Sequence, residues 1–211
     1  VSFHVNEGEI VTLIGANGAG KTTTMHAISG LLKLQSGEID YCGQTISKME
    51  AHKIIRLGLA QVPEGRRVFS GLTVQQNLQM GAYTRRDGKE AIQNDFDMVF
   101  DLLPRLKERR NQPAGTLSGG EKQRISIARA ILKKPKVLIL DDSTSAVDTA
   151  TDAKIRQAFR QDLPGTTKLI IAQWVTSVMD ADLILVMNDG AVVAQGTHEE
   201  LMKTCEIYRE V

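Results

Sequence analysis

A glycine-rich segment between two apolar patterns places the strongest constraint on the fold. Residues 15–22 read GANGAGKT and fit the pattern G-x-x-x-x-G-K-[ST]. The apolar run Ile10–Ile14 predicts a buried strand before this segment, and Lys21–Leu31 predicts a helix after it. A strand, a glycine loop and a helix in this order predict a phosphate-binding loop, because glycines let backbone N–H groups converge on an anion at a helix N-terminus.

The side chains of this loop predict a nucleoside triphosphate with Mg²⁺ as the ligand. We expect Lys21 to reach the β- and γ-phosphates, Thr22 to give its hydroxyl to Mg²⁺, and Thr23 to contact the α-phosphate. The other predicted phosphate contacts are Gly15, Asn17, Gly18, Ala19 and Gly20.

A second acidic segment fits the same chemistry. Residues 137–142 read VLILDD, so an apolar run leads directly into two carboxylates. A buried strand that ends in Asp141 would let its carboxylate hold Mg²⁺ through water. An Asp at a strand end can also cap a following helix or turn, but the phosphate-binding loop favours the metal role.

Short apolar runs alternate with helical patterns along the 211 residues, which predicts an α/β fold with a largely parallel core sheet. The predicted strands are Ile10–Ile14, Leu57–Val62, Lys136–Leu140, Lys168–Ala172 and Leu183–Met187, and Ala191–Ala194 is predicted as a hairpin partner of the last one. The predicted helices are Lys21–Leu31, Gly88–Leu103, Gly119–Leu132, Ala150–Gln161 and His198–Thr204. Between Pro63 and about Leu117 the chain lacks buried-strand runs, which predicts a helical subdomain inserted into the core.

Composition excludes some classes of protein. The formal net charge is +1, so the chain has no electrostatic footprint for nucleic acid. Cys42 and Cys205 lie far apart without metal-binding spacing, which is typical of a reduced, cytosolic protein. No apolar run has the length needed to cross a bilayer.

Residues 117–123 read LSGGEKQ and open a predicted helix. Ser118 and Gly120 at a helix N-terminus could form a second anion site, although Ser is also a preferred N-cap. With the loop at 15–22 and VLILDD, this segment makes the chain resemble the nucleotide-binding domain of an ABC transporter. The three motifs occur in the family's order and at family-like spacing, and the resemblance covers essentially the whole chain.

The resemblance implies a P-loop NTPase (RecA-like) core with an inserted α-helical subdomain and a truncated N-terminal antiparallel β part. We expect one domain over 1–211, with the core at 1–62 and 124–211 and the helical subdomain at 63–123. The family's ATPase activity uses ATP and Mg²⁺, and two such domains pair head to tail. Ser118 and Gly120 would then contact ATP held by the partner. Membrane-spanning transporter subunits, no nucleic acid, and a cytoplasmic position on the inner face of the cell membrane are also implied.

Three positions depart from the family's usual hydrolytic residues. Asp142 stands where Glu is common, Glu64 where Gln is common, and Gln173 where His is common. An Asp carboxylate retreats by about 1.5 Å relative to Glu, and a displacement of about 1 Å can cost ~10²-fold in rate. Gln173 can donate a hydrogen bond but cannot carry charge. We therefore expect these three catalytic candidates to give weakened hydrolysis at this chain's own site, with Glu64 also able to approach Mg²⁺.

The two halves resemble different subfamilies. The first half resembles importers of branched-chain amino acids in three segments, GANGAGKTTT, PEGRRVFSGLTVQQNLQMGAY and PRLKER. The second half resembles exporters in two segments, EKQRISIARAILKKPKVLILDDSTSAVDTATDAKIRQAF and DADLILVMNDGAVVAQGTHEEL. We hypothesise a chimera joined near Leu117–Gln123. The alternative to a chimera is a divergent natural domain. The alternatives to an ATPase that powers a transporter are an engineered or degenerate domain that binds ATP with little catalysis, and a soluble ABC ATPase outside transport.

Overall fold

The computed structural model describes residues 1–65, 67–141, 149–172 and 178–210, with the side chains of 149–152 excepted. The described chain divides into two compact units. Unit 1 comprises Val1–Gln61, Lys136–Asp142 and Gly165–Val211, and unit 2 comprises Val62–Pro135 and Ser143–Pro164.

The principal sheet has six strands in the order β4-β5-β6-β1-β7-β8. The bounds of these strands are β1 Ile10–Ile14, β4 Leu59–Val62, β5 Val137–Asp141, β6 Thr167–Ile171, β7 Leu183–Asn188 and β8 Ala191–Gly196. The pairs β5·β6, β6·β1 and β1·β7 are parallel, whereas β8 runs antiparallel to β7. A separate antiparallel pair joins β2 (Asp40–Tyr41) and β3 (Gln44–Thr45).

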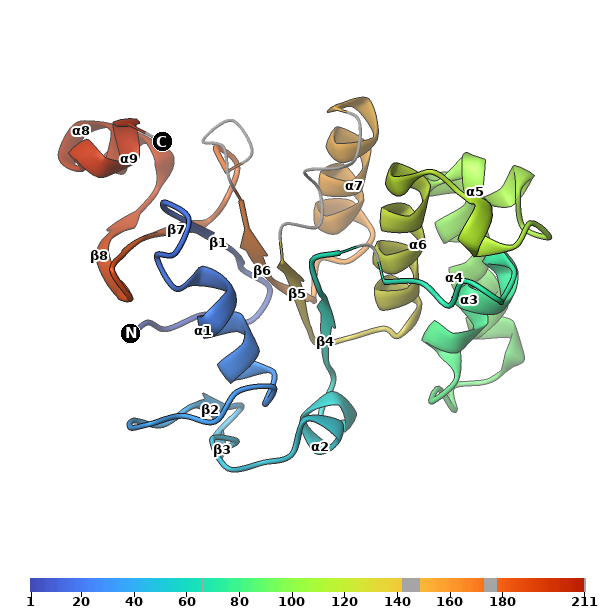
Figure 1. The fold of residues 1–211 in the computed structure, drawn as a ribbon, viewed down its shortest axis with the longest axis horizontal. Coiled ribbons are helices and arrows are strands. Elements are labelled where there is room, and N and C mark those ends of the chain that lie inside the picture. The colour runs from blue at the N-terminus through green and yellow to red at the C-terminus, as the bar shows by residue number, and fades with distance from the viewer. Residues whose placement is uncertain (66, 142–148, 173–177, 211) are drawn as a thin grey trace. The chain divides into compact units, whose positions relative to one another are not determined.

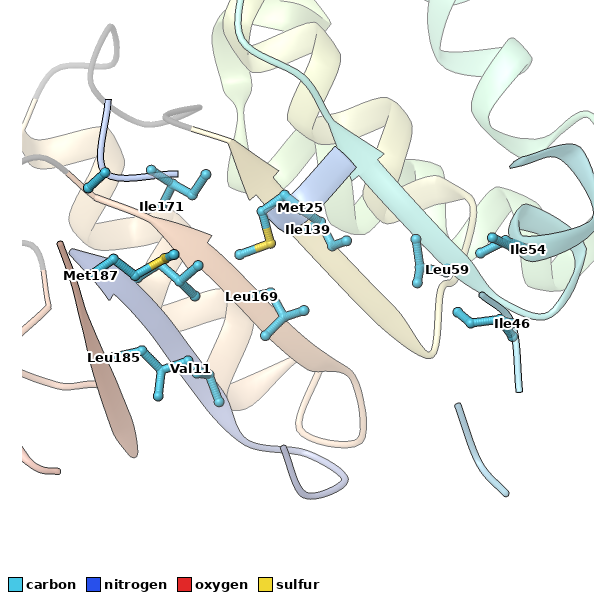
Figure 2. Close-up of a cluster of buried hydrophobic side chains, with 12 residues drawn as sticks. Val11, Met25, Ile46, Ile54, Leu59, Ile139, Leu169, Ile171, Leu185 and Met187 are labelled. Atoms are coloured by element: carbon cyan, nitrogen blue, oxygen red, sulfur yellow. The ribbon is translucent and has the colours of Figure 1, made fainter. Parts of the chain in front are cut away.

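Helices of unit 1 pack against both faces of β7, which explains why this strand is apolar along nearly its whole length. Successive residues of β7 point to opposite faces, so Leu185 and Ile184 enter two different hydrophobic clusters. One cluster receives Met25 from α1, and Figure 2 shows Met25 beside Ile139 of β5. The other receives Tyr208 from α9. The helices of unit 1 are α1 Lys21–Ile28, α2 Ala51–Arg56, α8 His198–Thr204 and α9 Glu206–Glu210.

Unit 2 consists mainly of helices (Figure 1). They are α3 Val74–Ala82, α4 Lys89–Leu102, α5 Pro104–Glu108, the short 3₁₀ helix Ala114–Thr116, α6 Gly119–Leu132 and α7 Thr149–Gln161. Helix α3 packs closely on α6, since a Cβ added to Gly81 would lie 2.3 Å from the carbonyl oxygen of Arg129. The buried guanidinium of Arg85 ties α4 to the end of α6 by pairing with Asp95 at 2.6 Å and donating to the carbonyl of Leu132 at 3.0 Å.

The prediction of an α/β fold with a parallel core sheet is confirmed. Two predicted elements extend at least two residues too far at one end, for reasons of backbone conformation. The first helix ends at Ile28 rather than Leu31, because Gly30 at φ 71° takes the left-handed conformation that terminates helices. The strand predicted from Leu57 begins at Leu59, because Leu57 caps α2 and Gly58 has φ 102°.

The compact units do not follow the expected boundary at residues 123 and 124. Helix α6 crosses that position without a break, so its second half stays with unit 2, and α7 belongs to unit 2 as well. The compact units therefore differ from the expected division at Val62 and over 124–135 and 143–164, and the expected division into core and helical subdomain stays a prediction.

Candidate nucleotide-binding site

The predicted phosphate-binding loop lies at the carboxyl end of β1, between this strand and α1. Three of its glycines have positive φ angles, at Gly15 (151°), Gly18 (85°) and Gly20 (96°). Residues with a Cβ rarely adopt these angles, so glycine is what lets the loop turn this tightly. Asn17 and Gly18 are exposed, whereas Gly15 and Ala19 are buried and anchor the loop.

The ammonium group of Lys21 lies folded back over the start of the loop. Its Nζ donates to the carbonyl oxygens of Gly15 at 2.6 Å and Ala16 at 2.9 Å, and the residue is 8% exposed. A buried cation held at the mouth of a glycine loop is a suitable group for binding phosphate oxygens. Thr23 is exposed on the first turn of α1.

Two residues that are distant in the sequence meet beside the loop. The hydroxyl of Thr22 donates to Oδ1 of Asp141 at 3.1 Å, across 119 residues of sequence. The sheet register explains the meeting, because Leu13 of β1 and Asp141 of β5 are both level with Ile171 of β6. A hydroxyl and a buried carboxylate are oxygen ligands of the kind that Mg²⁺ prefers, so these residues fit that ion.

The structure adds His26 to this site, which the sequence reasoning missed. Its Nε2 lies 3.8 Å from Oδ2 of Asp141. The helical spacing was the available signal, since residue 26 lies one turn after Thr22 on the same helix and so shares its face.

The end of β7 and the turn that follows it support the loop through backbone contacts, and the sequence reasoning missed this support as well. The N–H of Gly190 donates to the carbonyl of Ala19 at 3.1 Å. A Cβ added to Gly15 would lie 2.1 Å from the carbonyl oxygen of Met187. No side-chain pattern could have revealed these contacts, because they are made by backbone atoms.

The segment 117–123 begins α6 with a complete capping box. Ser118 Oγ accepts from the backbone N–H of Glu121 at 3.3 Å, and Glu121 Oε2 accepts from the N–H and hydroxyl of Ser118 at 2.9 Å and 2.7 Å. Burial raises the pKa of Glu121, but the hydrogen bonds from Ser118 and the charge of Arg109 outweigh it, so this pKa lies below its ordinary value. Ser118 is therefore an N-cap, and its exposure also leaves it accessible to a ligand. Gly120 lies on the first turn of the same helix.

The three catalytic candidates are not brought together by the described residues. Asp142 and Gln173 lie outside the described residues, as do Ser145–Asp148. Glu64 is an exposed residue of unit 2, whereas Thr22 and Asp141 belong to unit 1. The catalytic roles assigned to these three candidates stay predictions.

Comparison with known proteins identifies the family. The ABC transporter family matches residues 1–145, which are more than half of the chain. The chain is 41% identical over 204 residues to the high-affinity branched-chain amino acid transport ATP-binding protein BraG of Pseudomonas aeruginosa, covering 96% of this chain and 87% of BraG. This chain therefore belongs to the ABC transporter family, as a nucleotide-binding domain of the kind that binds ATP.

Exporters are similar to the chain as well. The probable multidrug resistance ABC transporter ATP-binding/permease protein YheI of Bacillus subtilis is 37% identical over 214 residues, which are all of this chain but 36% of YheI. The chain thus spans about a third of this relative. Both relatives match nearly the whole chain, and the hypothesis of a join near the signature segment stays a prediction.

Solved structures agree with the fold. A bacterial Atm1-family ABC exporter with ATP bound superposes with a TM-score of 0.87 at 30% identity, over 100% of this chain and 37% of that one. A nucleotide-free ATP-binding cassette from an ABC transporter gives a TM-score of 0.81 at 26% identity, over 99% and 90%. Within the described residues, no helix is both long and apolar enough to cross a membrane.

Proposed function

We propose that this chain is the ATP-hydrolysing module that powers an ABC membrane transporter, and that its own site hydrolyses ATP slowly. The contact between Thr22 and Asp141 carries the binding part of the proposal, because it places a hydroxyl and a carboxylate together next to the phosphate loop. Lys21 and the loop amides would bind the phosphates, and Thr22 and Asp141 would hold Mg²⁺. The ion would supply positive charge to the phosphate oxygens.

Bound phosphates would also change the position of the Lys21 side chain. Its ammonium now donates to two backbone carbonyls of the loop. The bonds to carbonyls already have a charged donor, but phosphate oxygens also carry negative charge, so the ammonium would form ion pairs with them and bind them more strongly. The ammonium would therefore exchange carbonyl oxygens for phosphate oxygens when ATP binds.

Slow hydrolysis rests on the residue types at three positions. Asp142 would orient the attacking water less well than a longer acid, because a shift of about 1 Å can lower a rate ~10²-fold. Gln173 is neutral where the family commonly has a residue that can carry charge. Glu64 would approach Mg²⁺ or water, and its negative charge near phosphate would oppose phosphate binding.

The remaining parts of the proposal concern partners. A second nucleotide-binding domain would pair head to tail with this one, so that Ser118 and Gly120 contact ATP held by the partner. The hydroxyl of Ser118 now donates to Glu121 and would have to turn toward phosphate in that complex. Closure of the pair would move membrane-spanning subunits, with the chain on the inner face of the cell membrane.

Nucleotide titration tests the binding site. ATP with Mg²⁺ should raise the melting temperature of the chain, and Lys21→Ala should weaken ATP binding by at least about tenfold, because a charge-assisted contact is lost. Lys33→Ala is a matched control, since Lys33 is an exposed lysine of the same unit. Equal ATP affinity in the wild type and in Lys21→Ala would overturn the proposal.

Phosphate release tests the hydrolytic part. Release should be slow, should rise with protein concentration if two chains build each site, and should increase in Asp142→Glu. Rapid release that is insensitive to Asp142→Ala would remove the role assigned to this acid. ATP binding without any release, at every protein concentration, would instead favour the alternative of a binding domain with little catalysis.

A further inference from the structure

Helix α1 brings a histidine to the buried carboxylate of the proposed metal site. Nε2 of His26 lies 3.8 Å from Oδ2 of Asp141, and Thr22 donates to the other oxygen, Oδ1, at 3.1 Å. We propose that His26 is a positioning residue, which holds the carboxylate of Asp141 in the orientation that binds Mg²⁺. This role rests on the proposed function, in which Thr22 and Asp141 hold the ion, and it belongs to a residue outside the phosphate-loop pattern.

The carboxylate of Asp141 needs more than one contact to be held in place. It can rotate about the bond that joins it to Cβ, and the contact with Thr22 involves Oδ1 alone. Carboxylates that bind metals are themselves hydrogen-bonded, and the loss of such a partner typically costs about 10–100-fold in metal affinity or activity. A donor at Oδ2 would therefore fix the plane of the carboxylate at the place where the ion binds.

An imidazole suits this role, because one of its nitrogens is a donor even when the ring carries no charge. Hydrogen bonds from nitrogen to oxygen measure about 3.0 Å, so Nε2 of His26 has to approach Oδ2 by about 0.8 Å. The side chain of His26 is 31% exposed, whereas that of Asp141 is 2% exposed. The ring is therefore the partner that is free to turn, and the buried carboxylate is the group that it holds.

Packing between α1 and β5 determines where the ring of His26 lies. Met25, its neighbour in the sequence, is fully buried and lies beside Ile139 of β5 (Figure 2). Ile139 and Asp141 are two residues apart, so they share one face of this strand. The core contact of Met25 therefore holds α1 against the face that carries Asp141. His26 follows Thr22 by one helical turn, so both residues reach the same carboxylate.

Titration with ATP, once with Mg²⁺ and once with a chelator in its place, measures how strongly the ion enhances ATP affinity. His26→Leu removes the donor and should reduce this enhancement by about tenfold, while ATP affinity without Mg²⁺ stays unchanged. His26→Gln should restore most of the enhancement, because its amide N–H can reach about as far from the backbone as Nε2 does. His26→Asn should not restore it, because its amide is one bond shorter, by about 1.5 Å.

Two controls show whether His26 acts through the carboxylate. His52→Leu should leave both affinities unchanged, because His52 is an exposed histidine of the same unit. Adding His26→Leu to Asp141→Asn should cause no further loss of ATP affinity in the presence of Mg²⁺, since the group on which His26 acts is already gone. A further loss in this double variant would overturn the positioning role, as would equal enhancement in His26→Gln and His26→Asn.

The remaining outcomes separate this role from the proposed function. If Mg²⁺ enhances ATP affinity equally in the wild type and in His26→Leu, the positioning role alone is overturned. An equal loss of affinity with and without Mg²⁺ in His26→Leu would also overturn it, because the effect would then be a general structural one. If Mg²⁺ does not enhance ATP affinity in the wild type, the metal site of the proposed function is overturned, and the role of His26 with it.

Discussion

Replacing Gly15 with Ala should destabilise the chain even without any nucleotide. The new Cβ would lie 2.1 Å from the carbonyl oxygen of Met187 and 3.1 Å from its carbonyl carbon, and both are backbone atoms that cannot rotate away. The φ angle of 151° adds strain, which costs of order 1–3 kcal/mol. Overpacking in a buried site costs a further ~1–3 kcal/mol, so we expect a loss of about 2–6 kcal/mol.

Gly18→Ala is the matched control for this experiment. Gly18 also has a positive φ angle, 85°, but a Cβ there would meet no atom within 4 Å. Its replacement should therefore cost only the backbone strain, about 1 kcal/mol. Each kcal/mol lowers the melting temperature of a domain of this size by roughly 2–4 °C.

Thermal unfolding in buffer without ATP or Mg²⁺ measures both variants. The expected result is a drop of about 10 °C for Gly15→Ala and about 3 °C for Gly18→Ala. Equal drops would refute the reasoning, because they would show that the carbonyl of Met187 places no steric limit on the loop. A drop confined to Gly18→Ala would refute it as well.

Three further predictions follow from other contacts. Gly81→Ala should lower the urea midpoint by an amount equivalent to about 1–3 kcal/mol, because its Cβ would lie 2.3 Å from the carbonyl of Arg129; an unchanged midpoint would contradict the close packing of α3 on α6. Glu121→Gln should be less stable than the wild type at pH 7, and the difference should narrow as the pH falls below the ordinary carboxyl value of 4.5. The folded-state pKa of Glu121 is lowered, so its charged form stabilises the fold at pH values above the unfolded pKa. This contribution is lost as the pH falls through the folded pKa. A difference in urea midpoints that does not change with pH would argue against this. Asp141→Asn should remove the dependence of ATP affinity on Mg²⁺ while leaving ATP binding without Mg²⁺ unchanged. Titration with ATP in the presence and absence of the ion measures this, and an affinity that still depends on Mg²⁺ would contradict it.

Elements with a strong local pattern could be predicted from the sequence. Strand β1 and helices α6 and α8 have the predicted bounds, because apolar spacing and capping residues are local signals. Helix α8 begins after Thr197, which forms a capping box with Glu200. Helix α3 also starts with a capping box, at Thr73, yet it was included only in a helical block and was not bounded. Its polar composition gave a weaker signal than the buried strands did.

The sequence by itself determined the chemistry of the phosphate loop. The order of apolar strand, glycines, lysine and threonine indicates this site, because each residue type has a local role there. The tertiary structure alone decided that Thr22 meets Asp141, since the parallel register of three strands brings together residues that lie 119 positions apart.

Tertiary structure also decided which backbone supports the loop. The carbonyl of Met187 leaves no space for a side chain at Gly15. Every residue type possesses such main-chain atoms, so no side-chain pattern could indicate this contact. Local interactions depend on residues that are neighbours in the sequence, whereas contacts between distant segments depend on how the folded chain places those segments.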